Sequence, residues 1–176
     1  MRRLALLAAA LLATPALATL APGAKAPPFT AQGAVAGKPF TVDLATALKK
    51  GPVVLYFFPA AFTGGCNAEA HAFAEAMDDF GKAGASVIGV TAGNVDKLEA
   101  FSAEKCAGKF AVAAATPAVV KAYDVSLGRA TPLGDITSRT SYVIGRDGRI
   151  AFVHSDMNPA EHVQLTLAAV RKLAAR

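Results

Sequence analysis

The chain has 176 residues, a length that fits one domain, and a formal net charge of +5. Its basic residues are scattered rather than grouped in runs, which argues against a nucleic-acid-binding surface and favours solvated faces. Two cysteines and three histidines do not provide the closely spaced ligand set of a structural zinc site. The cysteines, Cys66 and Cys106, could form a single structural bridge.

Residues 1–18, MRRLALLAAALLATPALA, have the layout of a secretory signal peptide: a charged start, a short apolar centre and small residues before the cleavage point. A buried amphipathic helix or a membrane anchor is the alternative, but the apolar centre is too short to span a bilayer. Cleavage near Ala18 would leave residues 19–176 and a charge of +3, because Arg2 and Arg3 are lost. We therefore expect a periplasmic or secreted protein, in a compartment where disulfides persist.

Three segments come before the first cysteine. Residues 19–40 are rich in Pro, Gly and Ala and are expected to run extended over the domain. Residues 40–51 predict a short strand or turn and then a short helix that ends at Gly51. Residues 52–59, PVVLYFFP, form a continuous apolar run bounded by prolines, which is typical of a strand buried on both faces.

Helices and strands alternate from Cys66 onward. In residues 66–84 the apolar side chains recur at helical spacing, and Gly81 and Gly84 provide the stop. The same reasoning predicts a strand at 85–92, a helix at 94–108 capped by Asn94, a weak strand at 109–114, a helix at 116–125 capped by Thr116, a hairpin at 140–154 around Asp147-Gly148, and a helix at 158–173 capped by Asn158. This alternation predicts an α/β fold whose sheet is covered on both faces and is mixed, because a hairpin ends it.

Cys66 stands where the buried strand passes into the helix. Open α/β sheets keep their chemistry at this edge, and the free N–H groups at a helix start favour a negative sulfur. The pKa of a thiol so placed can lie well below the usual 8.5, which yields the nucleophilic thiolate. Asn67, Ala68 and Glu69 follow it, so the Cys-x-x-Cys pair of a disulfide oxidoreductase is missing. His71 falls on a different part of the helix and is expected to be a surface histidine.

The segment PAAFTGGC, residues 59–66, resembles the Pro-x-x-x-Thr-x-x-Cys pattern of the peroxiredoxins. Glu69, three residues further on, is similar to the bacterioferritin-comigratory or Q-type members. The similarity extends over nearly all of residues 19–176, and residues 138–154 resemble the stretch that carries the family's active-site arginine. The resemblance implies a thioredoxin-like fold, with a central mixed β-sheet flanked by helices and an N-terminal extension, and the activity of a thiol-dependent peroxidase.

The same resemblance implies roles for individual residues. Cys66 matches the peroxidatic cysteine, which attacks the O–O bond of a hydroperoxide and becomes a sulfenic acid, and Thr63 matches the threonine that orients thiolate and peroxide. Pro59 matches the proline that shields the pocket from water, and Arg139 matches the arginine that stabilises the developing charge. Glu69 matches a subfamily glutamate. Gly64 departs from the proline of many Q-type members, which leaves the loop freer. Without the resemblance, Arg139 would read as a surface arginine and Thr63 as an ordinary turn residue.

Three interpretations of Cys106 remain open. It can be the resolving thiol that condenses with the sulfenic acid, a buried inert cysteine, or half of a permanent bridge to Cys66. Some Q-type relatives carry the resolving cysteine on the corresponding helix, but Cys106 falls about one turn beyond the expected position near Ser102. If it does resolve, we expect the first helical turn at Cys66 or the last turn at Cys106 to loosen on oxidation.

The resemblance implies a hydroperoxide substrate, a thioredoxin-like reductant, no cofactor, no metal, no nucleic acid and no membrane contact after signal cleavage, in a monomer. One alternative is an exported thioredoxin-fold redox partner or copper-delivery protein. His154 is available for copper, but a second cysteine close to the first is missing. A purely structural domain with one disulfide would leave the Thr-x-x-Cys pattern and Arg139 unexplained.

Overall fold

The computed structural model describes residues 19–132 and 134–175, and the predicted signal peptide, residues 1–18, lies outside them. Within this part of the chain, seven strands form one mixed sheet in the order β2-β1-β5-β4-β3-β8-β9, in which β3, β4 and β5 are parallel. The strands are β1 (Thr30–Val35), β2 (Lys38–Asp43), β3 (Val53–Phe57), β4 (Ser86–Thr91), β5 (Ala111–Ala114), β8 (Thr140–Ile144) and β9 (Ile150–Ser155). The predicted α/β fold with a mixed sheet is confirmed.

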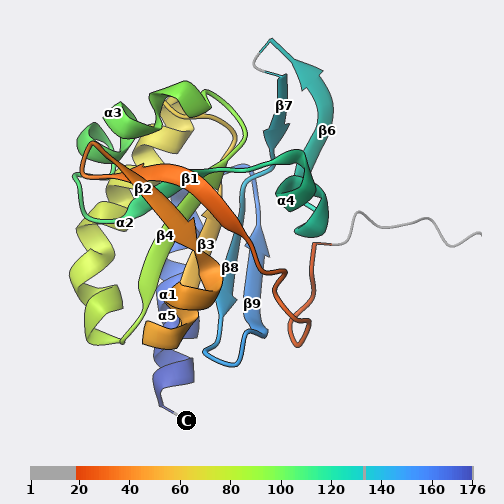
Figure 1. Ribbon diagram of the computed structural model, residues 1–176. Helices are drawn as coiled ribbons and strands as arrows, with labels where there is room; N and C mark the ends of the chain where they lie inside the picture. Colours follow the sequence, from red (N-terminus) through yellow and green to blue (C-terminus); the bar gives the residue numbers. More distant parts are fainter. Residues whose placement is uncertain (1–18, 133, 176) are drawn as a thin grey trace, which may run out of the picture.

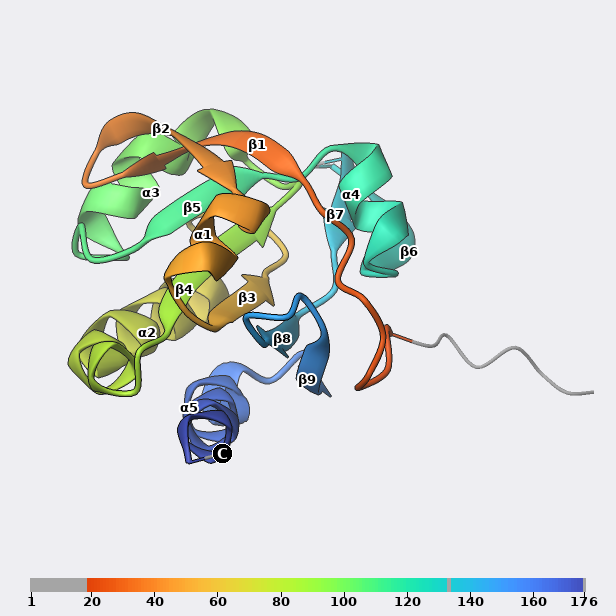
Figure 2. The same ribbon diagram turned by 60° about the horizontal axis from the view of Figure 1, so that its bottom comes forward.

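Helices cover both faces of the sheet, as Figures 1 and 2 show. They are α1 (Leu44–Lys50), α2 (Gly64–Lys82), α3 (Leu98–Glu104), α4 (Pro117–Ala122) and α5 (His162–Ala174), with 3-10 turns η1 (Val95–Lys97) and η2 (Pro159–Glu161). The central strand β3 is fully buried, and its side chains alternate between two cores. Val54 and Tyr56 pack with residues of α2, α3 and α5, whereas Val53, Leu55 and Phe57 pack with residues of α1 and α4.

The N-terminal segment differs from its prediction. Residues 21–24 form a turn, in which Gly23 and Ala24 exchange backbone hydrogen bonds with Ile150. Residues 30–43 form the antiparallel hairpin β1–β2, in which β2 is the edge strand of the sheet and β1 pairs with β5. The two turn residues, Ala36 and Gly37, both have positive φ, which is the geometry of a tight hairpin loop. Alanine rarely adopts that conformation, so residues 36 and 37 do not form a recognisable turn signal.

A second hairpin, β6 (Ser126–Thr131) with β7 (Gly134–Thr137), was not predicted. The register of its strands shifts between Ser126 and Ala130, so no regular alternation marks them in the sequence. Figure 1 shows this hairpin projecting beyond the main sheet. Strand β7 is nevertheless connected to the end of β3, because the buried Thr137 hydroxyl donates a hydrogen bond to the carbonyl of Phe58 at 2.7 Å.

The helix predicted at 94–108 is shorter than expected. Asn94 adopts a left-handed conformation before η1, and its side chain donates to the carbonyl of Ala61 instead of capping the helix. Helix α3 ends at Glu104, so Cys106 lies in the turn that follows it rather than on the helix. Thr116 and Asn158 do cap their segments as predicted, through side-chain oxygens that accept from Val119 N and Ala160 N. No helix of the described residues is long and apolar enough to cross a membrane.

Candidate active site

Helix α2 begins at Gly64, so Cys66 is its third residue and lies in the first turn, as predicted. The thiol is buried, with 1% of its surface exposed, and it is free. At this position the backbone N–H groups of the first turn lack partners within the helix. The site therefore places a sulfur where a negative charge is stabilised by the helix start.

The loop between β3 and α2 is fastened to the neighbouring loop after β4. The Thr91 hydroxyl donates to the carbonyl of Pro59 at 3.0 Å, and Ala61 N donates to the carbonyl of Gly93 at 3.2 Å. A Cβ at Gly93 would lie 2.5 Å from the Pro59 carbonyl oxygen, so only glycine permits this approach. Pro59 is buried in this loop, and its backbone is held in one place.

Thr63 occupies the N-cap position of α2 with an extended backbone. Its hydroxyl donates to the carbonyl of Ala60 at 3.1 Å and makes no cap bond to the helix. The donor of this hydroxyl is thus directed back into the loop, while its oxygen lone pairs remain available as acceptors.

Arg139 reaches the sulfur from the strand that lies beside β3. Thr140 of β8 pairs with Phe57 of β3, so the residue before β8 comes next to the end of β3. The guanidinium is 4% exposed, and its Nη2 lies 3.6 Å from Cys66 Sγ. Its Nε donates to the carbonyl of Met157 at 2.9 Å, which fixes the plane of the group. Arg139 and Cys66, both singled out by the resemblance, are therefore in direct contact.

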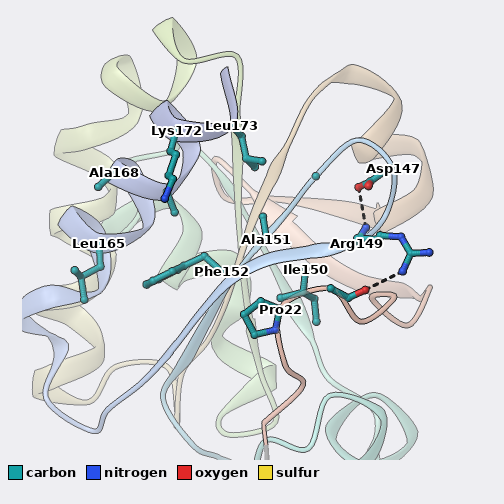
Figure 3. A pocket seen from close by; sticks show the side chains of 13 residues that line it. Pro22, Asp147, Arg149, Ile150, Ala151, Phe152, Leu165, Ala168, Lys172 and Leu173 are labelled. Atoms are coloured by element: carbon teal, nitrogen blue, oxygen red, sulfur yellow. Dashed lines mark hydrogen bonds between the residues drawn. The ribbon is translucent and has the colours of Figure 1, made fainter. Parts of the chain in front are cut away.

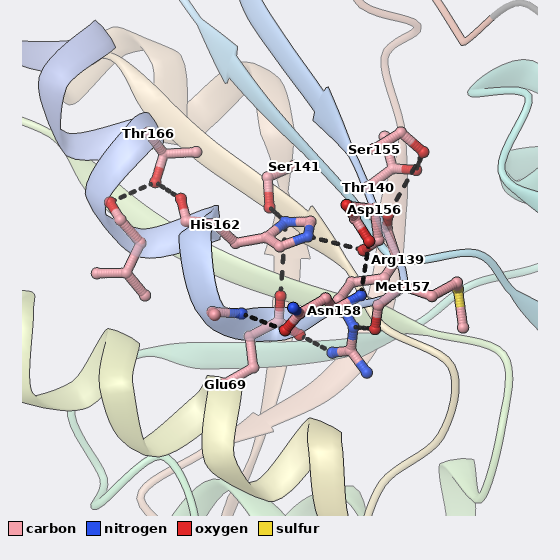
Figure 4. Close-up of polar contacts among 12 residues, drawn as sticks. Glu69, Arg139, Thr140, Ser141, Ser155, Asp156, Met157, Asn158, His162 and Thr166 are labelled. Atoms are coloured by element: carbon pink, nitrogen blue, oxygen red, sulfur yellow. Dashed lines mark hydrogen bonds and ion pairs between the residues drawn. The ribbon is translucent and has the colours of Figure 1, made fainter.

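Glu69 completes this charged group from one turn further along α2. It is fully buried and forms an ion pair with Arg139 Nη1. Burial raises the pKa of Glu69 to about 7, against the opposing attraction of Arg139. Its second oxygen, Oε1, lies 3.7 Å from Nδ1 of the buried His162 (Figure 4).

The chain is similar to known proteins in both sequence and fold. A sequence profile of the AhpC/TSA family matches residues 22–153. The chain belongs to the AhpC/TSA family. A chloroplastic peroxiredoxin Q of Sedum lineare is 29% identical over 86% of this chain and 78% of its own length, and that of Triticum aestivum is 30% identical over 76% of this chain and 60% of its own length.

Solved structures place the chain more narrowly. The peroxidoxin BcpB of Mycobacterium tuberculosis superposes with a TM-score of 0.76 at 28% identity, over 86% of this chain and 97% of that one. Peroxiredoxin Q of Xanthomonas campestris, at 24% identity, shares the fold with a TM-score of 0.68 over 81% of this chain and 90% of its own. This protein is thus a peroxiredoxin of the Q type with the thioredoxin-like fold, and a thiol-dependent peroxidase.

The second cysteine of this peroxiredoxin has a different setting. Cys106 is fully buried in the apolar core beyond α3, and it is not bonded to Cys66. Burial raises the pKa of its thiol to about 12. Its backbone N–H donates to the carbonyl of Phe101, and the next two residues, Ala107 and Gly108, have positive φ. The structure therefore contains no disulfide between Cys66 and Cys106.

Aromatic rings link the turn of Cys106 to the loop of Cys66. Phe62, with a φ of 61°, packs edge-on against Phe101 at 5.5 Å between centroids, and Lys105 Nζ lies 5.7 Å from the Phe62 ring centroid. Phe101 also stacks on Phe58 at 5.3 Å. Movement of the turn around Cys106 would therefore disturb the loop before Cys66 through these contacts.

Three other findings complete the site. His71 is a surface histidine, as predicted, and pairs with Glu75 at 3.4 Å. No group of three or more His, Cys, Asp or Glu side chains among the described residues could hold a metal ion. A cavity of about 600 Å³ lies between β9 and α5 near the turn of Asp147, at the end of the sheet away from Cys66, and no thiol lines it (Figure 3).

Sequence reasoning missed the polar side chains behind Arg139. It left Glu69 without a firm role and did not consider His162 or Ser141. One signal was available: Glu69 follows Cys66 by three residues, which places both on the same side of a helix flanked by alanines. The positions of His162 and Ser141 beside it depend on α5 and β8, which only the folded chain brings together.

Proposed function

We propose that Cys66 is the peroxidatic cysteine and that it reduces hydrogen peroxide and organic hydroperoxides. The thiolate sulfur attacks one peroxide oxygen, the O–O bond breaks, and the second oxygen leaves as hydroxide or alkoxide and takes up a proton. Cys66 becomes a sulfenic acid. The observation that carries this proposal is the 3.6 Å contact between Arg139 Nη2 and Cys66 Sγ at the start of α2, in a buried site.

In this proposal Arg139 stabilises both the thiolate and the charge that grows on the departing oxygen. A preorganised donor of this kind acts most strongly where water is excluded. Thr63 offers its hydroxyl oxygen to the peroxide O–H, since its own proton is given to the Ala60 carbonyl. Pro59 shields the pocket from water in a loop that Thr91 and Gly93 hold rigid.

We further propose that Cys106 resolves the sulfenic acid as an intramolecular disulfide. Its sulfur attacks the sulfenic sulfur, the S–OH bond breaks, and water leaves. Cys106 is buried and unionised, so it must first leave the core. The turn after α3 is the segment expected to loosen, because it lies outside the helix and contains Ala107 in a left-handed conformation. Hydrogen exchange tests this: equal protection of residues 104–109 in reduced and oxidised protein would argue against resolution by Cys106.

The electron donor is proposed to be a thioredoxin-like protein, since relatives of this family use thioredoxin-type reductants. Export to the periplasm or outside the cell, and a monomeric state, complete the proposal. Both rest on the sequence: the first on residues 1–18, the second on the Q-type resemblance. Mass spectrometry of protein expressed with its leader tests export, with Thr19 expected as the first residue, and light scattering tests the monomer.

Stopped-flow measurement of peroxide consumption by the reduced protein tests the main proposal. Rapid consumption of one equivalent, dependent on Cys66, is the expected result. Tight copper binding with negligible peroxide reactivity would instead favour the copper-delivery alternative.

A further inference from the structure

Only one of the two carboxylate oxygens of Glu69 accepts a hydrogen bond. Its Oε2 accepts from Arg139 Nη1, whereas its Oε1 is buried and has no hydrogen-bond donor. A buried carboxylate oxygen without a donor is costly, so this atom requires an explanation. The His162 ring at the start of α5 faces it, with Nδ1 3.7 Å away (Figure 4).

The hydrogen bonds of His162 fix its tautomer. Its Nε2 lies 2.9 Å from the carbonyl oxygen of Asp156, which can only accept, so Nε2 carries the ring proton. Its Nδ1 lies 2.8 Å from the Ser141 hydroxyl. Burial lowers the pKa of His162 to about 4, so the ring is neutral at pH 7 and Nδ1 is an acceptor. Glu69 Oε1 therefore faces an acceptor and not a donor.

The burial of Glu69 and its unpaired Oε1 favour one added proton at this point, and the neighbouring charge favours the carboxyl over the ring as its carrier. Arg139 lies on one side of Glu69, so a cationic His162 would face the guanidinium charge, and the ring of His154 on β9 packs against the His162 ring at 4.6 Å between centroids. The other titratable groups that face the pair are the Cys66 thiol on α2, the Tyr56 phenol on β3 and Asp156 before η2. A proton on Oε1 would give this oxygen a hydrogen to direct at Nδ1 and would leave Oε2 free to accept from Arg139.

We propose that Glu69 and His162 hold one proton between Oε1 and Nδ1, and that His162 is a positioning residue which thereby sets the charge that Arg139 presents to Cys66. With the proton bound, Glu69 is neutral and the guanidinium charge is left for the thiolate and the departing oxygen. When the proton leaves to solvent, the carboxylate neutralises Arg139. This inference rests on the proposed roles of Cys66 and Arg139.

The test is the pH profile of the second-order rate of Cys66 oxidation by hydrogen peroxide. The wild-type rate is expected to fall several-fold as the pH rises through about 7, where Glu69 loses its proton. Glu69→Gln imitates the protonated carboxyl, so the fall is expected to disappear and the variant should exceed the wild type at pH 8.5. A wild-type profile without this fall would overturn the inference.

Two variants, at His162 and at its partner Ser141, should shift the pH at which the oxidation rate falls, and in opposite directions. His162→Phe removes the acceptor for the proton and frees the Ser141 hydroxyl to donate to Oε1, so the fall shifts to lower pH. Ser141→Ala removes the competing donor to Nδ1, so the fall shifts to higher pH. Each shift should be about one pH unit, the size expected from one hydrogen bond to an ionisable group. A structural role would not give opposite shifts, and equal or absent shifts would contradict the proposal.

Thr166→Val is the matched control. Thr166 is fully buried on α5 and donates only to the carbonyls of His162 and Val163, so its loss leaves the ring nitrogens untouched. It should leave the profile unchanged. In the Glu69→Gln background, His162→Phe should also leave the profile flat, because no carboxyl proton remains.

Nitrogen NMR of the wild-type protein covers the case in which a ring variant does not fold. The His162 signals should show a protonated Nε2 and an unprotonated Nδ1 at pH 8.5, and a protonated Nδ1 there would refute the proposal. Slow peroxide reaction at every pH would mean that the proposed function fails. Fast reaction with no pH effect of Glu69→Gln would mean that only this inference fails.

Discussion

The two thiols of this protein are equally buried and yet lie in opposite settings. Cys66 stands in the first turn of α2 with the Arg139 guanidinium 3.6 Å from its sulfur. Cys106 lies beyond the end of α3 among apolar side chains, and burial raises its pKa to about 12. Burial alone therefore does not decide whether a cysteine reacts. The presence of a positive group and of free backbone N–H groups distinguishes the two sites.

The largest effect is expected from Cys66→Ser. A hydroxyl is not ionised at this position, so peroxide turnover should be abolished even though Cys106 remains. A coupled assay with a thioredoxin and its reductase measures this directly. Residual turnover in the variant would mean that Cys106 can react on its own and that the contrast between the two sites is wrong.

Cys106→Ser should give a different loss. The first equivalent of peroxide should still be reduced at the wild-type rate, because Arg139 and the start of α2 are unchanged. The enzyme should then stall as a sulfenic acid, which mass spectrometry can detect as a gain of one oxygen. Sustained turnover with thioredoxin would show that a thiol from another molecule resolves Cys66 and that Cys106 is inert.

Arg139→Lys tests the feature that separates the two sites while keeping the positive charge. Lysine lacks the planar fork that contacts the Met157 carbonyl, Glu69 and Cys66 together. The rate of the first oxidation should fall about 10²-fold, the size seen when one preorganised donor is lost. A rate within about twofold of the wild type, after a check that the variant folds, would contradict the role given to the guanidinium.

A smaller effect is expected in the pH dependence of stability. The raised pKa of Glu69, about 7, means that the folded state binds this proton more tightly, so stability from this group falls as the pH rises from about 4.5 to 7. The pKa of His162, lowered to about 4, acts in the opposite sense: stability is complete above pH 6.5 and is lost as the pH falls towards 4. In the wild type these two slopes largely cancel.

Glu69→Gln should expose the slope of His162. The free energy of unfolding of the variant, relative to the wild type, should fall by up to about 1.4 kcal/mol per pH unit between pH 6.5 and 4.5. Denaturant titrations of both proteins across this range measure it, and the remaining titrating groups are common to both. A parallel pH dependence of the two proteins would mean that Glu69 and His162 do not oppose each other.

The sequence predicts the elements next to Cys66 and Arg139 better than the two additional hairpins and the end of α3. The buried strand before Cys66, the helix after it and the hairpin after Arg139 each have a strong local pattern, and the structure contains all three. The hairpin β1–β2 was missed because Ala36 occupies a left-handed turn position, and the hairpin β6–β7 was missed because its register shifts. The end of α3 was misplaced because Cys106 follows helical spacing in a segment that turns at Ala107 and Gly108.

The polar group behind Arg139 could not be predicted for a different reason. The spacing of three residues is enough to place Glu69 near Cys66 on the same helix. The unpaired Oε1, the tautomer of His162 and the Ser141 hydroxyl depend on three elements that meet only in the folded chain. Patterns of apolar spacing carry no information about such contacts, and a resemblance transfers only the residues of its motif.

The most direct test of the contrast between the two thiols is to map the first sulfenic acid. Reduced wild-type protein is mixed with less than one equivalent of hydrogen peroxide in the presence of dimedone, and the labelled cysteine is identified by mass spectrometry. The adduct should form at Cys66 alone and should form more slowly in Arg139→Lys. Labelling at Cys106, or at Cys66 with a rate indifferent to Arg139, would contradict the account.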